Sequence, residues 1–271
     1  MYPLAFVIEV GGLRYPVYSF GLLLACAWLV GTGLLLVRIA RRGADPGAGV
    51  ALVGAATAGG IAGAYGLALL VHSAQGAPER GGLVAYGGLG GALLAAWWLA
   101  RALDIPGRQW LAWSVLPLAC AQAVGRVGCL LGGCCFGCPT TMAWGVRYAP
   151  EAGAAAAEAT RPHTVAIDAF RDPPWNGAAR HPTPLYEAAW VLGAAWCCEH
   201  FVPERYRFAA YVALYAAGRF VGEFLRADAI RGHDPWLALS TSQWLSAALL
   251  LALMPGLLRG ALQAWRSSAT P

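Results

Sequence analysis

Charged residues are scarce in this chain of 271 residues, where Asp, Glu, Lys and Arg together make up 12%. A soluble globular domain carries about twice that share. Lysine is absent, so all 19 basic residues are arginines. With 58% hydrophobic residues and a mean hydropathy of +0.53, the composition excludes an ordinary soluble domain and predicts an integral membrane protein. The arginines form no stripe interleaved with aromatic side chains, so we expect no nucleic-acid partner.

Seven apolar runs are long enough to span a membrane, because a helix needs roughly 20 apolar residues to cross the hydrocarbon core. They cover residues 17–37, 48–71, 82–100, 110–131, 184–202, 208–225 and 239–258. The third run is rich in glycine and the fifth begins with prolines, so these two are the least regular. The predicted fold class is an all-α polytopic membrane protein with about seven transmembrane helices. Residues 1–271 are expected to form a single membrane domain.

The segment between the fourth and fifth predicted spans, residues 138–184, is too polar to cross a membrane. We expect it to form a small extracytoplasmic head, with a short helix over the alanine-rich stretch "AGAAAAEA". Arginines follow the first, third, fifth and seventh spans, and loops rich in basic residues stay in the cytoplasm. These arginines are Arg38, Arg41, Arg42, Arg101, Arg108, Arg205, Arg207, Arg259 and Arg266. This predicts an outer N-terminus and a cytoplasmic C-terminus.

Four stretches place polar residues at membrane depth or at its outer edge, where desolvation makes polar groups costly. They are "YGGLGG" (86–91), "GRVGCLLGGCCFG" (125–137), "HPTPLYE" (181–187) and "GRFVGEFLRAD" (218–228), the last followed by "LSTSQ" (239–243). The predicted topology puts all of them in the outer half of the bilayer. Convergence of five helix ends on one leaflet is more than packing requires and indicates a functional site.

Two arginines, Arg126 and Arg219, each follow a glycine inside apolar sequence. One such arginine alone can snorkel to the headgroups or pair with a buried acid. Glu223, four residues after Arg219, lies on the same helical face and offers such a pair. The two arginines together favour a phosphate site, because a guanidinium presents a planar donor fork that suits phosphate oxygens. In the outer leaflet the available phosphate is a phospholipid headgroup.

These motifs, in this order, resemble those of the prolipoprotein diacylglyceryl transferases, which are seven-helix enzymes of the bacterial inner (plasma) membrane. The resemblance covers most of the chain. It implies transfer of the diacylglyceryl group of phosphatidylglycerol to the lipobox cysteine thiol in a preprolipoprotein signal peptide, with release of glycerol phosphate. The partners implied are phosphatidylglycerol, that signal peptide and the surrounding membrane lipids, and no cofactor is expected.

Carried over by position, Arg126 and Arg219 match the family's two essential arginines. We expect them to clamp the lipid phosphate, with Glu223 orienting Arg219. Tyr86 and His181 are candidates for positioning the substrate or handling a proton. A further set of residues is expected to bind substrate: Gly87, Gly88, Gly137, Tyr186, Glu187, Arg226 and Gln243.

The sequence departs from the family's pattern in three motifs. Tyr86 stands where the family usually has the histidine of "HGGL", and Phe20 replaces the tyrosine of "WYGL". Cys129 and Cys134 stand where "GRxGNFxNGE" has asparagine and glutamate. Histidine is a suitable base near neutral pH, whereas tyrosine, with an ordinary pKa of about 10, is not. We therefore favour activation of the incoming thiol by the arginines.

Four of the eight cysteines form a cluster, Cys129, Cys134, Cys135 and Cys138. Their spacing could hold zinc or an iron–sulfur cluster, but no second ligand set stands at a recognised spacing, so we expect no metal. A disulfide in an oxidising compartment and plain packing at a helix end both stay open. Two rival functions also stay open. One is a divergent paralogue acting on or binding another lipid or acceptor, and the other is a membrane redox or metal protein.

Overall fold

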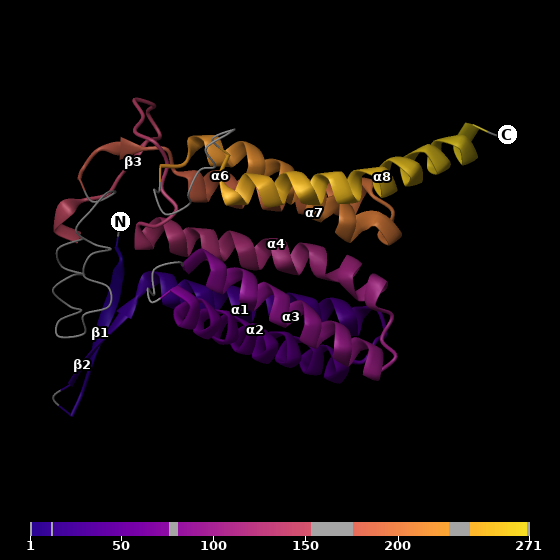
Figure 1. Ribbon diagram of the computed structural model, residues 1–271, viewed down its shortest axis with the longest axis horizontal. Helices are drawn as coiled ribbons and strands as arrows, with labels where there is room; N and C mark the ends of the chain where they lie inside the picture. Colours follow the sequence, from indigo (N-terminus) through magenta and orange to yellow (C-terminus); the bar gives the residue numbers. More distant parts are fainter. Residues whose placement is uncertain (1, 12, 76–80, 153–175, 228–238, 270–271) are drawn as a thin grey trace. The chain divides into compact units, whose positions relative to one another are not determined.

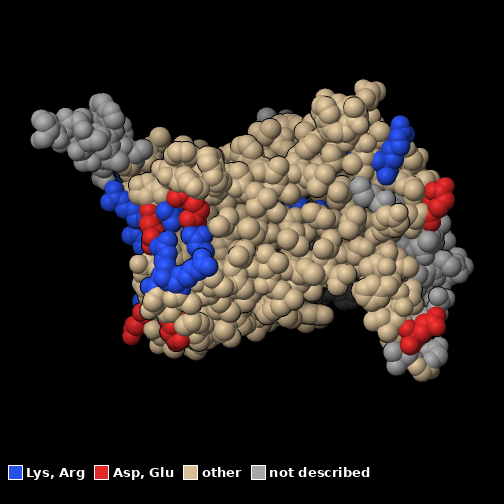
Figure 2. All heavy atoms as spheres, turned by 180° about the vertical axis from the view of Figure 1, so that it is seen from behind, with Lys and Arg blue, Asp and Glu red and all other residues tan. Residues whose placement is uncertain are grey.

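A computed structural model of the chain describes residues 2–11, 13–75, 81–152, 176–227 and 239–269. For 71–75, 81–86 and 261–269, among others, it describes the backbone alone. The described chain is mostly helical (Figure 1). On the face drawn in Figure 2, charged side chains gather in a few groups, and the surface between them is uncharged.

Seven long helices lie in the described chain, and each overlaps one predicted span. They are α1 (Ser19–Arg41), α2 (Pro46–Gln75), α3 (Gly81–Ala102), α4 (Gly107–Gly132), α6 (Thr183–Phe201), α7 (Glu204–Gly222) and α8 (Thr241–Ala269). Stretches of α1, α2, α4, α7 and α8 are long and apolar enough to cross a membrane. The remaining two helices, α3 and α6, correspond to the irregular third and fifth runs. The prediction of an all-α polytopic membrane protein is confirmed.

The chain divides into two compact units. One comprises Met1–Gly31 with Leu118–Pro271, and the other is Thr32–Pro117. The boundaries fall inside α1 and α4, and the second boundary is at Pro117, a proline within α4. The assignment of residues 1–271 to one membrane domain, with a head over 138–184, stays a prediction. The helix expected over "AGAAAAEA" falls mostly outside the described residues.

In the unit Thr32–Pro117, α2 and α3 pack backbone to backbone. A Cβ added at Gly91 would lie 2.1 Å from the carbonyl oxygen of Gly59, and one at Gly63 would lie 2.2 Å from that of Gly87. Only glycine permits this approach, as at small-residue interfaces between membrane helices. Gly87 and Gly91 of the third predicted span therefore have a packing role.

The other unit begins with a β-hairpin that the sequence analysis did not anticipate. Strands β1 (Leu4–Val10) and β2 (Leu13–Tyr18) pair in antiparallel register. Gly11 in the turn has φ +59°, a left-handed conformation that glycine adopts at little cost. The pair of glycines at 11–12, between two apolar stretches, is a hairpin signal in the sequence.

Helices α6, α7 and α8 follow in the same unit, and α7 packs against both of its neighbours (Figure 1). A short 3₁₀ turn, η2 (Glu223–Leu225), continues α7. A Cβ at Gly218 would meet the indole of Trp190 at 2.0 Å, so this glycine lets α6 and α7 approach closely. Two short strands, β3 (Val146–Arg147) and β4 (Ala179–Arg180), pair in the segment that precedes α6.

Candidate active site

The loop after α4 is held between the start of α6 and the end of α7 by backbone hydrogen bonds. Gly137 donates to the carbonyl of His181 (3.1 Å) and forms a β-bridge with Arg226, while Cys138 donates to the carbonyl of Leu225 (2.9 Å). A Cβ at Gly137 would lie 2.6 Å from that of His181. The loop can therefore pass here only with glycine, and three distant motifs meet around it.

One carboxylate, Glu187 in the second turn of α6, gathers three guanidinium groups. Its Oε2 lies 2.7 Å from Nη2 of Arg126, and its Oε1 lies 2.6 Å from Nη1 of Arg219 and 2.8 Å from Nη1 of Arg226. Arg219 also pairs with Glu223 at 3.1 Å. The structure thus brings together five predicted site residues from α4, α6 and the end of α7, including the expected pair of Arg219 and Glu223.

These five side chains, which we call the arginine–glutamate cluster, carry a surplus of positive charge. Three guanidinium groups against two carboxylates leave a formal charge of +1. The Arg226 and Glu223 side chains are 2% and 4% exposed, whereas that of Arg126 is 21% exposed. Buried charge is costly unless it is paired. The cluster is therefore suited to an additional anionic group, and Arg126 is its most accessible member.

His181 and Tyr186 form a second group at the start of α6. The His181 Nδ1 atom lies 3.2 Å from the Tyr186 hydroxyl, which also accepts a hydrogen bond of 2.8 Å from the indole of Trp144. Trp144 was missed by the sequence analysis because its partner is 42 residues away. The only signal was its place in a polar stretch near a predicted site.

Arg180 is another residue that the sequence analysis missed. It is 6% exposed, donates to the carbonyl of Gly137 (3.4 Å) and lies 5.0 Å from the centre of the Phe136 ring. Its position directly before "HPTPLYE" was the available signal. Through these contacts Arg180 links the segment before α6 to the loop that leads away from α4.

Gln243 fixes the start of α8. Its side-chain Oε1 accepts a hydrogen bond from the backbone amide of Ser240 (2.9 Å), and the backbone amide of Gln243 donates to the Ser240 hydroxyl (3.2 Å). This reciprocal arrangement is a capping box. Its side-chain amide also donates to the carbonyl of Phe220 in α7 (3.4 Å). These bonds account for Gln243 structurally, and contact with substrate stays a prediction.

The third-span motif lies in α3, within the unit Thr32–Pro117. The Tyr86 side chain lies outside the described residues. A Cβ at Gly87 would lie 2.5 Å from the carbonyl oxygen of Gly63, and one at Gly88 would lie 3.4 Å from that of Gly60. Packing against α2 explains Gly87, whereas a Cβ at Gly88 would make only an ordinary contact. The expected binding of substrate by both glycines stays a prediction.

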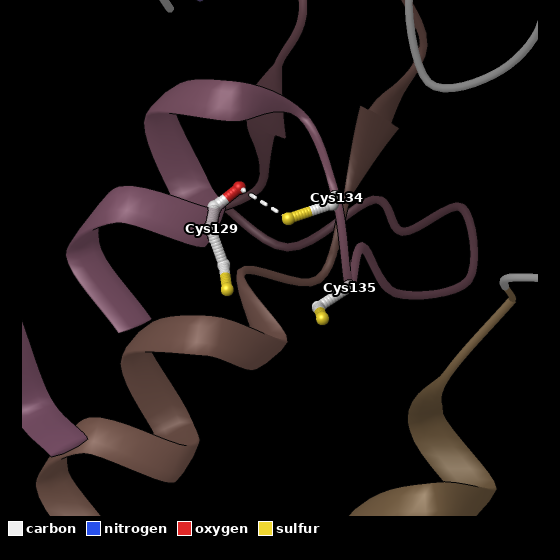
Figure 3. A group of neighbouring side chains, drawn as sticks. All are labelled: Cys129, Cys134 and Cys135. Carbon is white, nitrogen blue, oxygen red and sulfur yellow. Dashed lines mark hydrogen bonds between the residues drawn. The ribbon is translucent and has the colours of Figure 1, made fainter. Parts of the chain in front are cut away.

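A tight turn at the end of α4 brings three cysteines together. Gly133 has φ +71°, its amide donates to the carbonyl of Leu130 (3.4 Å), and the Cys134 amide donates to that of Cys129 (3.0 Å). This is a Schellman motif, which reverses the chain at a helix end. As Figure 3 shows, Cys134 and Cys135 then lie close to Cys129, with all three Sγ atoms within 4.8 Å of one another.

Cys135 is the member of this cysteine triad that contacts the arginine–glutamate cluster. Nη1 of Arg126 donates to its Sγ at 3.7 Å. Hydrogen bonds from the Cys129 and Cys134 thiols, and then the charges of Arg226 and Arg126, lower the pKa of Cys135. Hydrogen bonding to the Cys129 and Cys135 sulfurs raises the pKa of Cys134. The lowered pKa thus belongs to the member of the triad that lies beside the Arg126 guanidinium.

The fold and the site define a multi-pass membrane protein with a buried, net cationic cluster at converging helix ends. A family model described as prolipoprotein diacylglyceryl transferase matches residues 6–259. The chain belongs to this family, as its motifs predicted.

Curated relatives agree with this assignment. The phosphatidylglycerol–prolipoprotein diacylglyceryl transferase of Clostridium tetani is 30% identical over 253 residues, which cover 89% of this chain and 91% of the relative. A protein of the same name from Frankia alni is 34% identical, over 66% of this chain and 43% of its own. A relative from Streptomyces coelicolor, named phosphatidylglycerol–prolipoprotein diacylglyceryl transferase 2, is 34% identical over 64% of this chain and 50% of its own.

Proposed function

We propose that this protein transfers the diacylglyceryl group of phosphatidylglycerol to a cysteine thiol in the lipobox of a preprolipoprotein signal peptide. Phosphatidylglycerol and prolipoprotein are the substrates in the names of its relatives. The observation that carries the proposal is the arginine–glutamate cluster, which has a formal charge of +1 and an accessible guanidinium at Arg126.

The reaction is a displacement at carbon. The acceptor sulfur attacks the glyceryl carbon, a carbon–sulfur bond forms, and the bond from that carbon to the phosphate oxygen breaks. The electron pair leaves with glycerol phosphate, and the thiol proton goes to solvent. Negative charge therefore develops on a phosphate oxygen. Arg126 and Arg219 are held in place before the reaction, so they stabilise this charge without reorganising.

The chain order supports a site in the outer half of the bacterial inner membrane. If α1 ends in the cytoplasm at Arg38 and Arg41, then alternation of the seven helices puts the ends of α4 and α7 outside. The starts of α6 and α8 then lie outside as well. This orientation has an outer N-terminus and a cytoplasmic C-terminus, and it follows the positive-inside rule.

The test is a transfer assay with phosphatidylglycerol and a lipobox peptide. Arg126→Ala and Arg219→Ala are expected to insert into the membrane but to lose transfer. Arg205→Ala is the matched control, because Arg205 lies over the Tyr206 ring at the opposite end of α7 from the cluster, and it should keep normal activity. Near-normal lipidation by either cluster variant would refute the proposed role of the arginines.

A second candidate is the same transfer with a different lipid or acceptor. It is favoured by the departures at Tyr86, Cys129 and Cys134 from the family's usual residues. Rescue of cells depleted of their own diacylglyceryl transferase supports the first candidate. Transfer in vitro from another phospholipid, without such rescue, supports the second.

A further inference from the structure

We propose that Cys129, Cys134 and Cys135 bind a thiophilic divalent metal ion of the zinc class, with one coordination position left open for the acceptor thiol. The site itself stands on the geometry of the cysteine triad. The use of the open position rests on the proposed function, because only a thiol acceptor has a sulfur to offer.

The triad has the dimensions of a three-thiolate site. Zinc binds sulfur at about 2.3 Å, so the sulfurs of a tetrahedral site lie about 3.8 Å apart. The three Sγ atoms already lie within 4.8 Å of one another, and small side-chain rotations close the difference. The Schellman turn builds this proximity into the backbone (Figure 3). The sequence spacing alone allowed a metal site but led us to expect none, because it shows neither the turn nor the resulting convergence of three sulfurs.

Three protein ligands and one open position characterise catalytic zinc sites, whereas structural sites are closed by four ligands. The fourth cysteine of the sequence cluster, Cys138, donates from its Sγ to the carbonyl of Arg226 at 3.6 Å, and Cys134 makes a similar bond to the Cys129 carbonyl that it would give up on binding an ion. What separates Cys138 from the triad is the position of its sulfur. It stands outside the group of sulfurs that can share one ion. The triad therefore fits the open pattern.

The surrounding charge also fits. A divalent ion with three thiolates carries a formal charge of −1, and the neighbouring arginine–glutamate cluster carries +1. Nη1 of Arg126, 3.7 Å from the Cys135 sulfur, is placed to donate to a metal-bound thiolate. Such outer contacts orient ligands and compensate their charge. The neighbouring guanidinium groups would thus partly compensate the charge of the metal unit, in a buried place where unpaired charge is costly.

The open position would supply the thiol activation that tyrosine at position 86 does not provide as a base. A thiol that coordinates the metal gives up its proton to solvent. The bound sulfur then attacks the glyceryl carbon, and the carbon–oxygen bond to the phosphate breaks with its electron pair leaving on glycerol phosphate. The product is a neutral thioether, which is a weaker ligand than a thiolate and leaves the metal. The ion changes neither charge nor oxidation state.

Metal analysis of the full-length purified protein tests the site. We expect about one zinc ion per chain, lost in Cys129→Ser and in Cys134→Ser. Cys138→Ser is the near control and Cys197→Ser, in α6, the distant one, and both should retain the ion. Cobalt(II) loaded into the wild-type protein should show a sulfur-to-cobalt charge-transfer band that grows when a lipobox peptide is added. This second measurement needs no variant to fold.

Four results would overturn part of the reasoning, and they are distinguishable. Wild-type protein that stays metal-free after zinc repletion excludes the site. Another result is metal-free protein with a disulfide between two triad cysteines, which lowers its mass by two hydrogens until reductant is added. That result would show that the triad is a redox pair and not a metal site. Full transfer activity after removal of the metal leaves the proposed function standing and excludes the catalytic role. Bound metal without transfer to any lipobox peptide leaves the metal site standing and excludes the proposed function.

Discussion

Glu187→Gln is the sharpest test of how the site is held together. The amide keeps the shape of the side chain but removes the charge that Arg126, Arg219 and Arg226 share. The formal charge of the cluster rises from +1 to +2, with only Glu223 left as an anion. Breaking a buried ion pair by neutralising one partner costs about 3–5 kcal/mol. For a chain of this size we expect the thermal midpoint in detergent to fall by roughly 6–12 °C.

The matched control is Glu199→Gln near the other end of α6. Glu199 pairs with Arg207 at 3.3 Å, so the same chemical change there removes an ion pair but leaves the arginine–glutamate cluster intact, and it should lower the midpoint less. Phosphatidylglycerol should restore stability to Glu187→Gln more than to the wild type, because its phosphate replaces the lost carboxylate. Diacylglycerol, which lacks the phosphate, should not. Equal midpoints for Glu187→Gln and Glu199→Gln would refute the role of Glu187 as the centre of the cluster.

Three further variants test single features. Arg219→Lys should insert normally but restore little transfer relative to Arg219→Ala, because an ammonium group does not reproduce the donor fork; wild-type rates would count against a bidentate role. Tyr86→His should give no gain in rate at neutral pH if the base is not at this position, and a gain of about tenfold in the pH–rate profile would contradict that. Gly137→Ala should destabilise the protein and lower transfer, because its Cβ would lie 2.6 Å from that of His181; unchanged melting and rate would show that the loop is free to shift.

The parts of the structure that sequence predicted are those set by local pattern. Run length and apolarity located the helices, and the spacing of four residues located the pair of Arg219 and Glu223. Convergence of the motifs was predicted from topology, but the identity of the central residue was not. Glu187 meets Arg126 and Arg226 only because three helix ends are folded together, and no spacing along the chain encodes that contact. It was therefore expected only as one of several residues that bind substrate.

The hairpin was missed for a different reason, and the same reason explains why the four clustered cysteines were identified without the convergence of three of them. Both depend on a glycine in the left-handed region, Gly11 in one and Gly133 in the other. Such turns bring together residues that linear motifs treat as separate. The pattern of ligands in "GRVGCLLGGCCFG" becomes interpretable only when the reversal after α4 is known.

The glycine contact between α2 and α3 has a consequence for how the protein is made. Its two halves, Gly59 with Gly63 and Gly87 with Gly91, are close in the sequence, so this helix pair can form while later helices are still being synthesised. The arginine–glutamate cluster is the opposite case, because its last member is Arg226. Until α7 and its end have entered the membrane, Glu187 can pair with Arg126 but not with Arg219 or Arg226. Biogenesis therefore completes the cluster late, and a chain stopped before α6 would leave the Arg126 guanidinium in the membrane without the Glu187 carboxylate.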